Sequence, residues 1–206
     1  MPILTMTASL QSEETGLEYQ QPAAGVSPEV PRPEALRSLE EHMAPFLHRV
    51  PERMRGLYSG SSPLEVRPTE FHVPWDAKPR PPSRAFWLRA RGALPDDLHL
   101  HQRLLAYVSD WGLLETSLMP HPKALWNPDM QCASLSHGIH FHRSFRLDKQ
   151  WLCHVMTSPS SSGGRGFALG EVWTEDGVLV ASTSQEGLIR AGRPRGPGKT
   201  VGSDET

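Results

Sequence analysis

Apolar residues surround the segment from Arg103 to Ser117 (RLLAYVSDWGLLETS), as in a helix that is buried on all sides. Asp110 stands in the middle of this run, and its neighbours one helical turn away are Ala106, Tyr107, Leu113 and Leu114. A carboxylate removed from water is costly unless a hydrogen bond or an opposite charge compensates it. The pattern therefore predicts one long buried helix that carries a functional or firmly partnered aspartate.

Alternation of polar and apolar residues predicts strands on both sides of this helix. Residues 64–72 and 85–91 alternate before it, with Pro68 indicating an edge or a bulge in the first. Four more strand-like segments follow the helix, with a hairpin turn at Glu175-Asp176-Gly177 between the last two: residues 130–143, 151–158, 166–174 and 178–190. This order predicts an α+β fold in which an antiparallel sheet wraps around the long helix.

The flanking segments lack this patterning and divide the chain into four parts. Residues 1–32 include a stretch rich in Pro, Glu, Ser and Gly, which predicts a linker or disordered arm. Residues 33–61 are expected to hold a short helix that begins near Pro33 and ends at Pro45. Residues 62–190 form the predicted folded domain, and residues 191–206 are expected to be a disordered tail.

The composition is that of an ordinary globular protein. Of 206 residues, 37% are hydrophobic and 21% charged, and a formal net charge of −2 gives no basic field to gather nucleic acid or anionic membrane. No apolar stretch approaches the roughly 18 residues that span a bilayer, and the first residues do not resemble a secretory signal. Cys132 and Cys153 lie in apolar strand-like segments, which favours buried thiols in a reducing compartment over a disulfide.

Three polar residues stand out on the predicted elements: Asp110 on the helix, Ser134 on the next strand, and Gln185 on the last strand. A carboxylate, a hydroxyl and an amide can together hold and polarise one water, which suits hydrolysis without a covalent intermediate. The alternative is that they are three unrelated polar residues with ordinary backbone partners. Spacing alone favours that alternative.

Other polar groups suggest sites that the pattern supports less well. His137, His140 and His142 could indicate a metal, but a half-exposed strand explains them better, and the cysteines lack CxxC spacing. The run Gly163-Gly164-Arg165-Gly166 precedes a strand rather than a helix, which favours a flexible turn over a phosphate-binding loop. The basic residues from Arg190 onward are expected to be solvated. We therefore expect no metal and no cofactor.

Several segments together resemble the acyl-CoA thioesterase II family. They are LEVRPTEFHVP, FWLRARG, LPDDLHLHQRLLAYVSDWGLLETSLMPH, HGIHFHRSFRLDKQWLCHVMTSPS and GGRGFALGEVWTEDGVLVASTSQEGLIR, in one register from about residue 62 to Arg190. The family is built from two hotdog repeats, and the resemblance covers the second, so it implies a single hotdog domain. It also implies that residues 1–32 hold a remnant of the first repeat and a linker, in a shortened product or partial gene model.

The resemblance implies a reaction and its residues. The family's catalytic aspartate, hydroxyl residue and glutamine fall on Asp110, Ser134 and Gln185, where they would orient a water that attacks the thioester of a fatty acyl-CoA. The family commonly has threonine at the position of Ser134, a change that keeps the hydroxyl but loses the methyl that restricts its rotamer. Two nearby positions also depart from the family's pattern, since Ser136 replaces an acidic residue and His140 an aromatic one.

The resemblance further implies acyl-CoA as substrate and a peroxisomal or cytoplasmic location, although the sequence ends in GSDET rather than a Ser-Lys-Leu type address. A lone hotdog that pairs with a second copy by two-fold symmetry would be a homo-oligomer, which we also expect. One alternative is a catalytically inactive, truncated hotdog that only binds acyl-CoA or oligomerises, because a lone hotdog exposes a sheet edge and apolar surface. Another alternative, a metal-dependent hydrolase, depends on the histidines alone.

Overall fold

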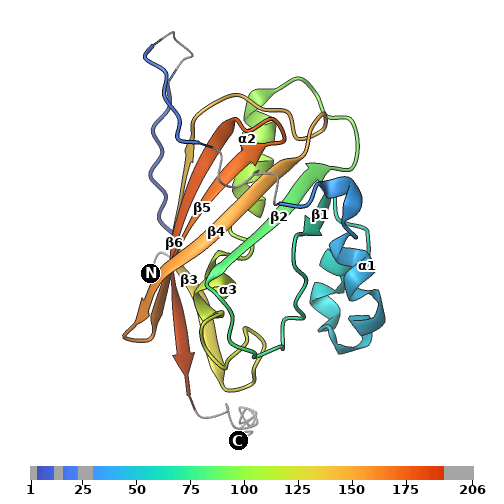
Figure 1. Cartoon of the computed structure of the whole chain (residues 1–206), viewed down its shortest axis with the longest axis vertical. Helices are drawn as coiled ribbons and strands as arrows, with labels where there is room; N and C mark the ends of the chain where they lie inside the picture. Colours follow the sequence, from blue (N-terminus) through green and yellow to red (C-terminus); the bar gives the residue numbers. More distant parts are fainter. Residues whose placement is uncertain (1–3, 12–15, 23–29, 193–206) are drawn as a thin grey trace, which may run out of the picture.

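Six antiparallel strands form one curved sheet in a computed structural model that describes residues 4–11, 16–22 and 30–192. The strands lie side by side in the order β1-β2-β4-β5-β6-β3 (Figure 1). Their bounds are Leu64–Pro68 (β1), Ser83–Ala90 (β2), Met130–Phe141 (β3), Leu152–Ser162 (β4), Arg165–Thr174 (β5) and Leu179–Ala191 (β6). Each predicted strand is present, and the predicted hairpin turn closes at Gly177 between β5 and β6. The prediction of an antiparallel sheet is confirmed.

The structure has two helices where one long helix was predicted, so the prediction of a continuous helix through Asp110 is wrong. Helix α2 spans Leu98–Val108, begins at an Asp97 cap, and is followed after a turn by α3, which spans Leu113–Leu118. The chain leaves α2 at Ser109 and changes direction at Gly112, whose φ of 85° lies in the left-handed region that favours glycine. Asp110 therefore lies in a turn rather than within a helix, and its side chain is exposed rather than buried.

The core lies between these helices and the concave face of the sheet. Leu105 and Val108 of α2 and Leu113 of α3 are fully buried there. From the sheet they meet a set of buried apolar side chains: Leu88, Leu152, Met156, Ala168 and Val172. Burial of one such aliphatic side chain contributes about 1.5–3 kcal/mol, so this layer holds the helices against the sheet. The predicted arrangement of a curved sheet around helical structure is thus confirmed.

Helix α3 lies unusually close to the sheet because two strand residues facing it are glycines. A Cβ added to Gly166 of β5 would meet the side chain of Ser117, with 2.5 Å between it and Ser117 Cβ. A Cβ added to Gly187 of β6 would collide with a methyl group of Leu114. Glycine within a strand often marks such a close approach of a neighbouring element.

The segment before β1 is helical but is not the single helix expected to end at Pro45. Ser38 begins α1 through a capping box with Glu41, and Pro45 lies in the first turn of the following 3-10 helix instead of ending the helical region. The elements here are η2 (Pro33–Ala35), α1 (Leu39–Met43), η3 (Ala44–Arg49) and η4 (Glu52–Tyr58).

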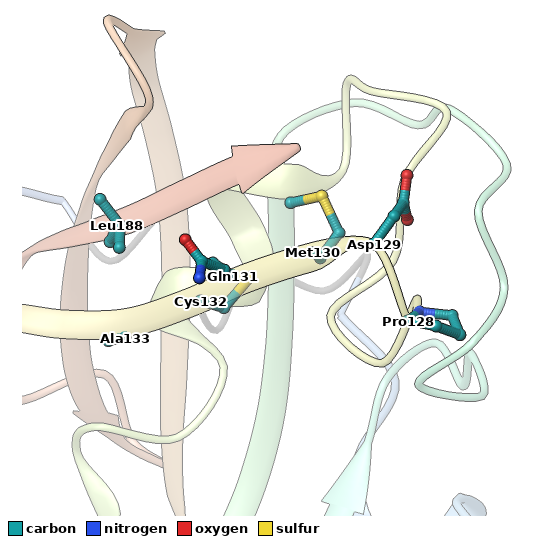
Figure 2. A pocket seen from close by; sticks show the side chains of 7 residues that line it. All are labelled: Pro128, Asp129, Met130, Gln131, Cys132, Ala133 and Leu188. Atoms are coloured by element: carbon teal, nitrogen blue, oxygen red, sulfur yellow. The ribbon is translucent and has the colours of Figure 1, made fainter. Parts of the chain in front are cut away.

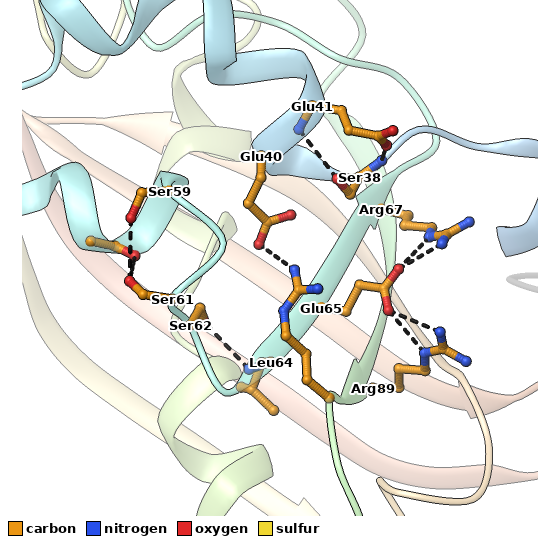
Figure 3. Close-up of polar contacts among 12 residues, drawn as sticks. Ser38, Glu40, Glu41, Ser59, Ser61, Ser62, Leu64, Glu65, Arg67 and Arg89 are labelled. Carbon is orange, nitrogen blue, oxygen red and sulfur yellow. Dashed lines mark hydrogen bonds and ion pairs between the residues drawn. The ribbon is translucent and has the colours of Figure 1, made fainter.

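A buried carboxylate fastens this segment to the edge of the sheet. Glu65 is 7% exposed and accepts hydrogen bonds from Arg67 and Arg89, at 2.6–3.0 Å (Figure 3). The two guanidinium groups hold the pKa of the Glu65 carboxyl below its usual range, against the opposing effect of burial. Arg67 also donates to the carbonyl oxygens of Pro33 and Leu36, which ties the start of the helical segment to β1.

Parts of the N-terminal arm also contact the sheet. Gln20 bonds to Gly177 O and Leu179 N at the β5–β6 hairpin, and Trp87 donates to Pro31 O. The predicted tail lies outside the described residues from position 193 onward. The described helices include none that is long and apolar enough to cross a membrane.

Candidate active site

Asp110, Ser134 and Gln185 come together at one end of the β3–β6 pair. Ser134 Oγ donates to Asp110 Oδ1 at 3.1 Å, and Gln185 Nε2 lies 2.6 Å from the same oxygen. Gln185 Nε2 also lies 2.5 Å from Ser134 Oγ, so each residue contacts the other two. The structure thus groups the three candidate residues that the resemblance assigns to the reaction.

A β-bulge at Leu135 determines which side chains of β3 face this group. Ser134 pairs with Gly187, whereas Ser136 pairs with Glu186, so Leu135 is an extra residue on the β3 side. The extra residue reverses the alternation beyond it, because successive side chains on a strand point to opposite faces. His137, which pairs with Gln185, consequently lies on the same face as Ser134.

The three side chains differ sharply in their exposure to solvent. Gln185 is only 2% exposed, whereas Asp110 and Ser134 are exposed in the described chain. The two hydrogens of Gln185 Nε2 are directed to Asp110 Oδ1 and Ser134 Oγ, and both bonds to the carboxylate converge on Oδ1. Among the described residues nothing donates to Asp110 Oδ2, which is therefore available to accept a proton from a water.

Two polar residues that the sequence did not assign to the site adjoin it. Ser109, which is fully buried and ends α2, lies with its Oγ 2.8 Å from His137 Nε2. Burial lowers the pKa of His137, and the nearby Asp110 carboxylate and Gln185 side chain oppose that shift. His137 could have been found only by placing the bulge and the β3–β6 register, which the sequence pattern does not reveal.

The two further departures from the family's pattern lie away from this group. Ser136 pairs with Glu186 and His140 with Ser182, on the face of the sheet opposite to Gln185, and both are exposed. Neither side chain therefore packs against Asp110, Ser134 or Gln185.

The site opens at the edge of the sheet, because β3 is an outer strand. A shallow hollow runs along the start of β3 next to Ser134 and is lined by Pro128, Asp129, Met130, Gln131, Cys132, Ala133 and Leu188 (Figure 2). Large apolar side chains that are close in sequence to the carboxylate and the hydroxyl are exposed. Tyr107, three residues before Asp110, is 57% exposed, and Leu135, directly after Ser134, is 54% exposed.

The described residues contain no group of three His, Cys, Asp or Glu side chains arranged to hold a metal ion. His137 contacts Ser109, whereas His142 contacts Ser182 Oγ at 2.8 Å, so these two histidines have separate partners. Gly163 and Gly164 form the turn between β4 and β5, both with positive φ, as predicted for a turn rather than a phosphate loop. Neither cysteine is in a disulfide.

The sequence pattern of the acyl-CoA thioesterase family matches residues 54–188 of the chain. The chain is 35% identical over 188 residues to acyl-CoA thioesterase 2 of Haemophilus influenzae, a match that covers 91% of this chain and 64% of that protein. Among solved structures, it resembles acyl-CoA thioesterase II TesB2 of Mycobacterium marinum, with a TM-score of 0.63 and 30% identity over 89% of this chain and 61% of the other. A hotdog-fold protein of unknown function from Alicyclobacillus acidocaldarius shares the fold, with a TM-score of 0.57 and 19% identity, over 87% of this chain and 59% of that one. The predicted hotdog fold is confirmed, and the chain spans less than two thirds of the length of each of these proteins.

Proposed function

Since the chain belongs to the acyl-CoA thioesterase family, we propose that it hydrolyses fatty acyl-CoA to the free fatty acid and CoA. The observation that carries the proposal is the mutual contact of Asp110, Ser134 and Gln185, each within 3.1 Å of the other two. The reaction would belong to fatty acid and acyl-CoA metabolism. A peroxisomal or cytoplasmic location stays a prediction.

In the proposed reaction Asp110 acts as the general base. A water that donates to Oδ2 attacks the thioester carbonyl carbon, forms the new C–O bond and gives its proton to the carboxylate. Collapse of the tetrahedral intermediate breaks the C–S bond, and the proton passes from Asp110 to the CoA sulfur, which restores the carboxylate. Gln185 and Ser134 hold Oδ1 through charge-assisted hydrogen bonds and so fix the direction in which Oδ2 points.

The surroundings of the set suit an acyl substrate. Tyr107 and Trp111 flank Asp110 in the chain and contact each other edge-to-face, with 5.8 Å between ring centroids. Tyr107 and Leu135, which directly follows Ser134, are exposed, and exposed apolar side chains close to a polar site often mark a binding surface. We propose that the acyl chain lies along these residues.

The edge strand supports a second proposal, that the domain pairs with another hotdog domain through β3. Strand β3 is twelve residues long and has one neighbour, β6, among the described strands. A long edge strand with free N–H and C=O groups is a template for pairing. A second copy of the chain would suffice for this, which supports the expected homo-oligomer. The alternative function, an inactive hotdog that only binds acyl-CoA or oligomerises, follows if pairing occurs without turnover.

The deciding experiment is acyl-CoA hydrolysis by the purified chain, with short, medium and long acyl groups and release of the CoA thiol as the readout. Asp110→Asn is expected to lower kcat about 10²–10⁴-fold, the usual contribution of a general base, without loss of fold because the side chain is exposed. Glu70→Gln changes another exposed carboxylate and should leave turnover unchanged. A folded wild-type chain that binds acyl-CoA without hydrolysing it would establish the alternative instead.

A further inference from the structure

We propose that a cavity at the β1–β2 edge of the sheet binds the phosphate group of a small, hydrophilic phosphate monoester. The cavity has a volume of about 500 Å³, which lies within the range of about 300–1,000 Å³ that is usual for small-molecule sites. Its lining residues are all either charged or small: Glu65, Arg89, Ala90, Arg91, Gly92, Ala93, Asp148 and Lys149. Strand β3, which carries Ser134, forms the other edge of the sheet, so the cavity is separate from the candidate active site.

The charges around this cavity are layered, with carboxylates beneath and cations outside. Three carboxylates have side chains that are only 0–14% exposed: Glu40, Glu65 and Asp148. Three cations have side chains that are 34–66% exposed: Arg89, Arg91 and Lys149. An anion that approaches from solvent therefore meets positive charge first, and a cleft lined by one sign of charge attracts ions of the other sign.

The two carboxylates of the lining are also bound by cations that lie outside it. Glu65 Oε1 accepts two hydrogen bonds from Arg67, at 2.6 and 2.8 Å (Figure 3). Asp148 accepts two from Arg146 and one from Leu94 N, at 3.0–3.1 Å. The Arg146 guanidinium holds the pKa of the Asp148 carboxyl well below its usual range. These outside partners leave the cations of the lining in excess over its carboxylates.

Several donors of the lining have no acceptor among the described residues. In Arg89 the remaining donor is Nη1, and in Arg91 the remaining donors are Nε and Nη1. Lys149 Nζ makes an ion pair at 3.7 Å, which is too long for a hydrogen bond. The backbone N–H groups of Gly92 and Ala93, both exposed, also lack an acceptor within the described chain. Guanidinium, ammonium and backbone N–H groups are the donors that bind phosphate oxygens in proteins.

The lining also restricts the rest of the ligand. The described lining residues include no aromatic and no large apolar side chain, so the cavity offers neither a stacking platform for a nucleobase nor a surface for an acyl chain. The nearby ring of Trp151 is covered by the guanidinium of Arg89, which lies 4.3 Å from the ring centroid. The space beside the phosphate therefore suits a hydrophilic group such as a polyol or a sugar.

The first test is equilibrium dialysis with radiolabelled inorganic phosphate at constant ionic strength. We expect saturable binding of one phosphate per chain, and we expect Lys149→Gln and Arg91→Gln each to weaken it about 5–10-fold, because each removes a charge-assisted contact. Arg103→Gln removes the same charge from an exposed position outside the cavity and should leave the Kd unchanged. Absence of saturable binding, or equal weakening by Arg103→Gln, would overturn the proposal.

A second variant predicts a change of the opposite sign. Glu40→Gln removes the carboxylate that competes with a ligand for Arg91, so it should tighten phosphate binding about threefold. A misfolded chain would not bind more tightly, so this variant keeps the test decisive if Arg91→Gln destabilises the fold by leaving Glu40 without its cation. Unchanged or weaker binding by a folded Glu40→Gln variant would count against the assigned role of Arg91.

Competition against labelled phosphate identifies the class of ligand. Glycerol 3-phosphate is expected to compete at least as well as inorganic phosphate, and adenosine 5′-monophosphate no better than glycerol 3-phosphate, because the lining has no stacking surface. Glycerol 3-phosphate that competes at least tenfold more weakly than inorganic phosphate would show a site for the free ion and overturn the monoester assignment. Adenosine 5′-monophosphate that competes at least tenfold better than glycerol 3-phosphate would show a nucleotide site and overturn it as well. None of these measurements requires turnover, so the outcome is independent of the function proposed for Asp110.

Discussion

Substitution of Gly166 by alanine is expected to destabilise the chain and to displace α3 from the sheet. The new Cβ would lie 2.5 Å from Ser117 Cβ, whereas ordinary contact begins at 3.4 Å, so the two elements must separate by nearly 1 Å. The obstacle is a Cβ atom, which no side-chain rotation can move, and Ser117 is only 1% exposed. Overpacking of a close-packed interior costs about 1–3 kcal/mol, and we expect this case to fall in the upper half of that range.

Urea denaturation measures how much Gly166→Ala lowers the free energy of unfolding, and a double-mutant cycle tests whether the contact with Ser117 is the cause. Ser117→Gly removes both atoms of Ser117 that the new Cβ would meet, Cβ and Oγ, and should itself cost about 0.5 kcal/mol through helix propensity. In the Ser117→Gly background, Gly166→Ala should hardly change the free energy of unfolding, which gives a coupling energy of about 1–3 kcal/mol between the two substitutions. In the Ser117→Ala background, which retains the Cβ, Gly166→Ala should still destabilise the chain in part. Gly92→Ala, where a Cβ meets nothing within 4 Å, is the control. Additive effects of Gly166→Ala and Ser117→Gly would refute the reasoning.

Three further outcomes are expected. Ser134→Thr keeps the hydroxyl, so its kcat should stay within a few-fold of the wild-type value. Ser134→Ala removes the oxygen that accepts a hydrogen bond from Gln185 and should lower kcat at least about tenfold, as measured by release of the CoA thiol. Burial lowers the pKa of His154 to about 3, so between about pH 6.5 and pH 3 the unfolded state binds a proton that the folded state does not. The free energy of unfolding should therefore be highest above about pH 6.5 and fall by about 1.4 kcal/mol per pH unit toward pH 3. Urea denaturation of His154→Met at several pH values should lack this decrease. Burial raises the pKa of Cys153 to about 12, so mass spectrometry after brief alkylation of the native chain should find the label on the half-buried Cys132 and not on Cys153.

The strands were predictable because their signals are local. Alternation along residues 85–91 placed Phe86 and Leu88 on one face, and both are in the core between sheet and helices. The turn at Glu175-Asp176-Gly177 was equally local, since it requires only a residue that accepts positive φ between two strands. The ends of the strands differ from the predicted ones by a few residues at most.

The break between α2 and α3 was not predictable from the same pattern. Apolar residues recur at helical spacing on both sides of Asp110, at Val108, Trp111 and Leu114, and a glycine inside such a segment is compatible with a continuous helix at a cost of about 1 kcal/mol. The position of α3 depends on its close packing against Gly166 and Gly187, which follow the α3 residues they face, Ser117 and Leu114, by 49 and 73 residues. The expected burial of Asp110 failed for this reason.

The members of the site were named through the resemblance, whereas their geometry came from the structure. Spacing alone favoured three unrelated polar residues. The bulge at Leu135, which turns His137 toward Gln185, has no signal in the sequence, because β3 alternates only weakly and its register is set by β6. The contact of Ser109 with His137 likewise depends on where α2 ends.

The break in the helix connects the stability of the fold to the geometry of the site. Gln185 is buried within the sheet, whereas Asp110 belongs to a turn whose position is fixed by α2 on one side and by α3 on the other. A shift of α3 by nearly 1 Å would therefore move the carboxylate relative to the amide, whose hydrogen bond spans only 2.6 Å. We expect Gly166→Ala to lower kcat well below wild type even at temperatures where the variant is fully folded, and Ser117→Gly to restore kcat together with stability. Recovery of stability without recovery of kcat would show that the position of Asp110 does not follow α3.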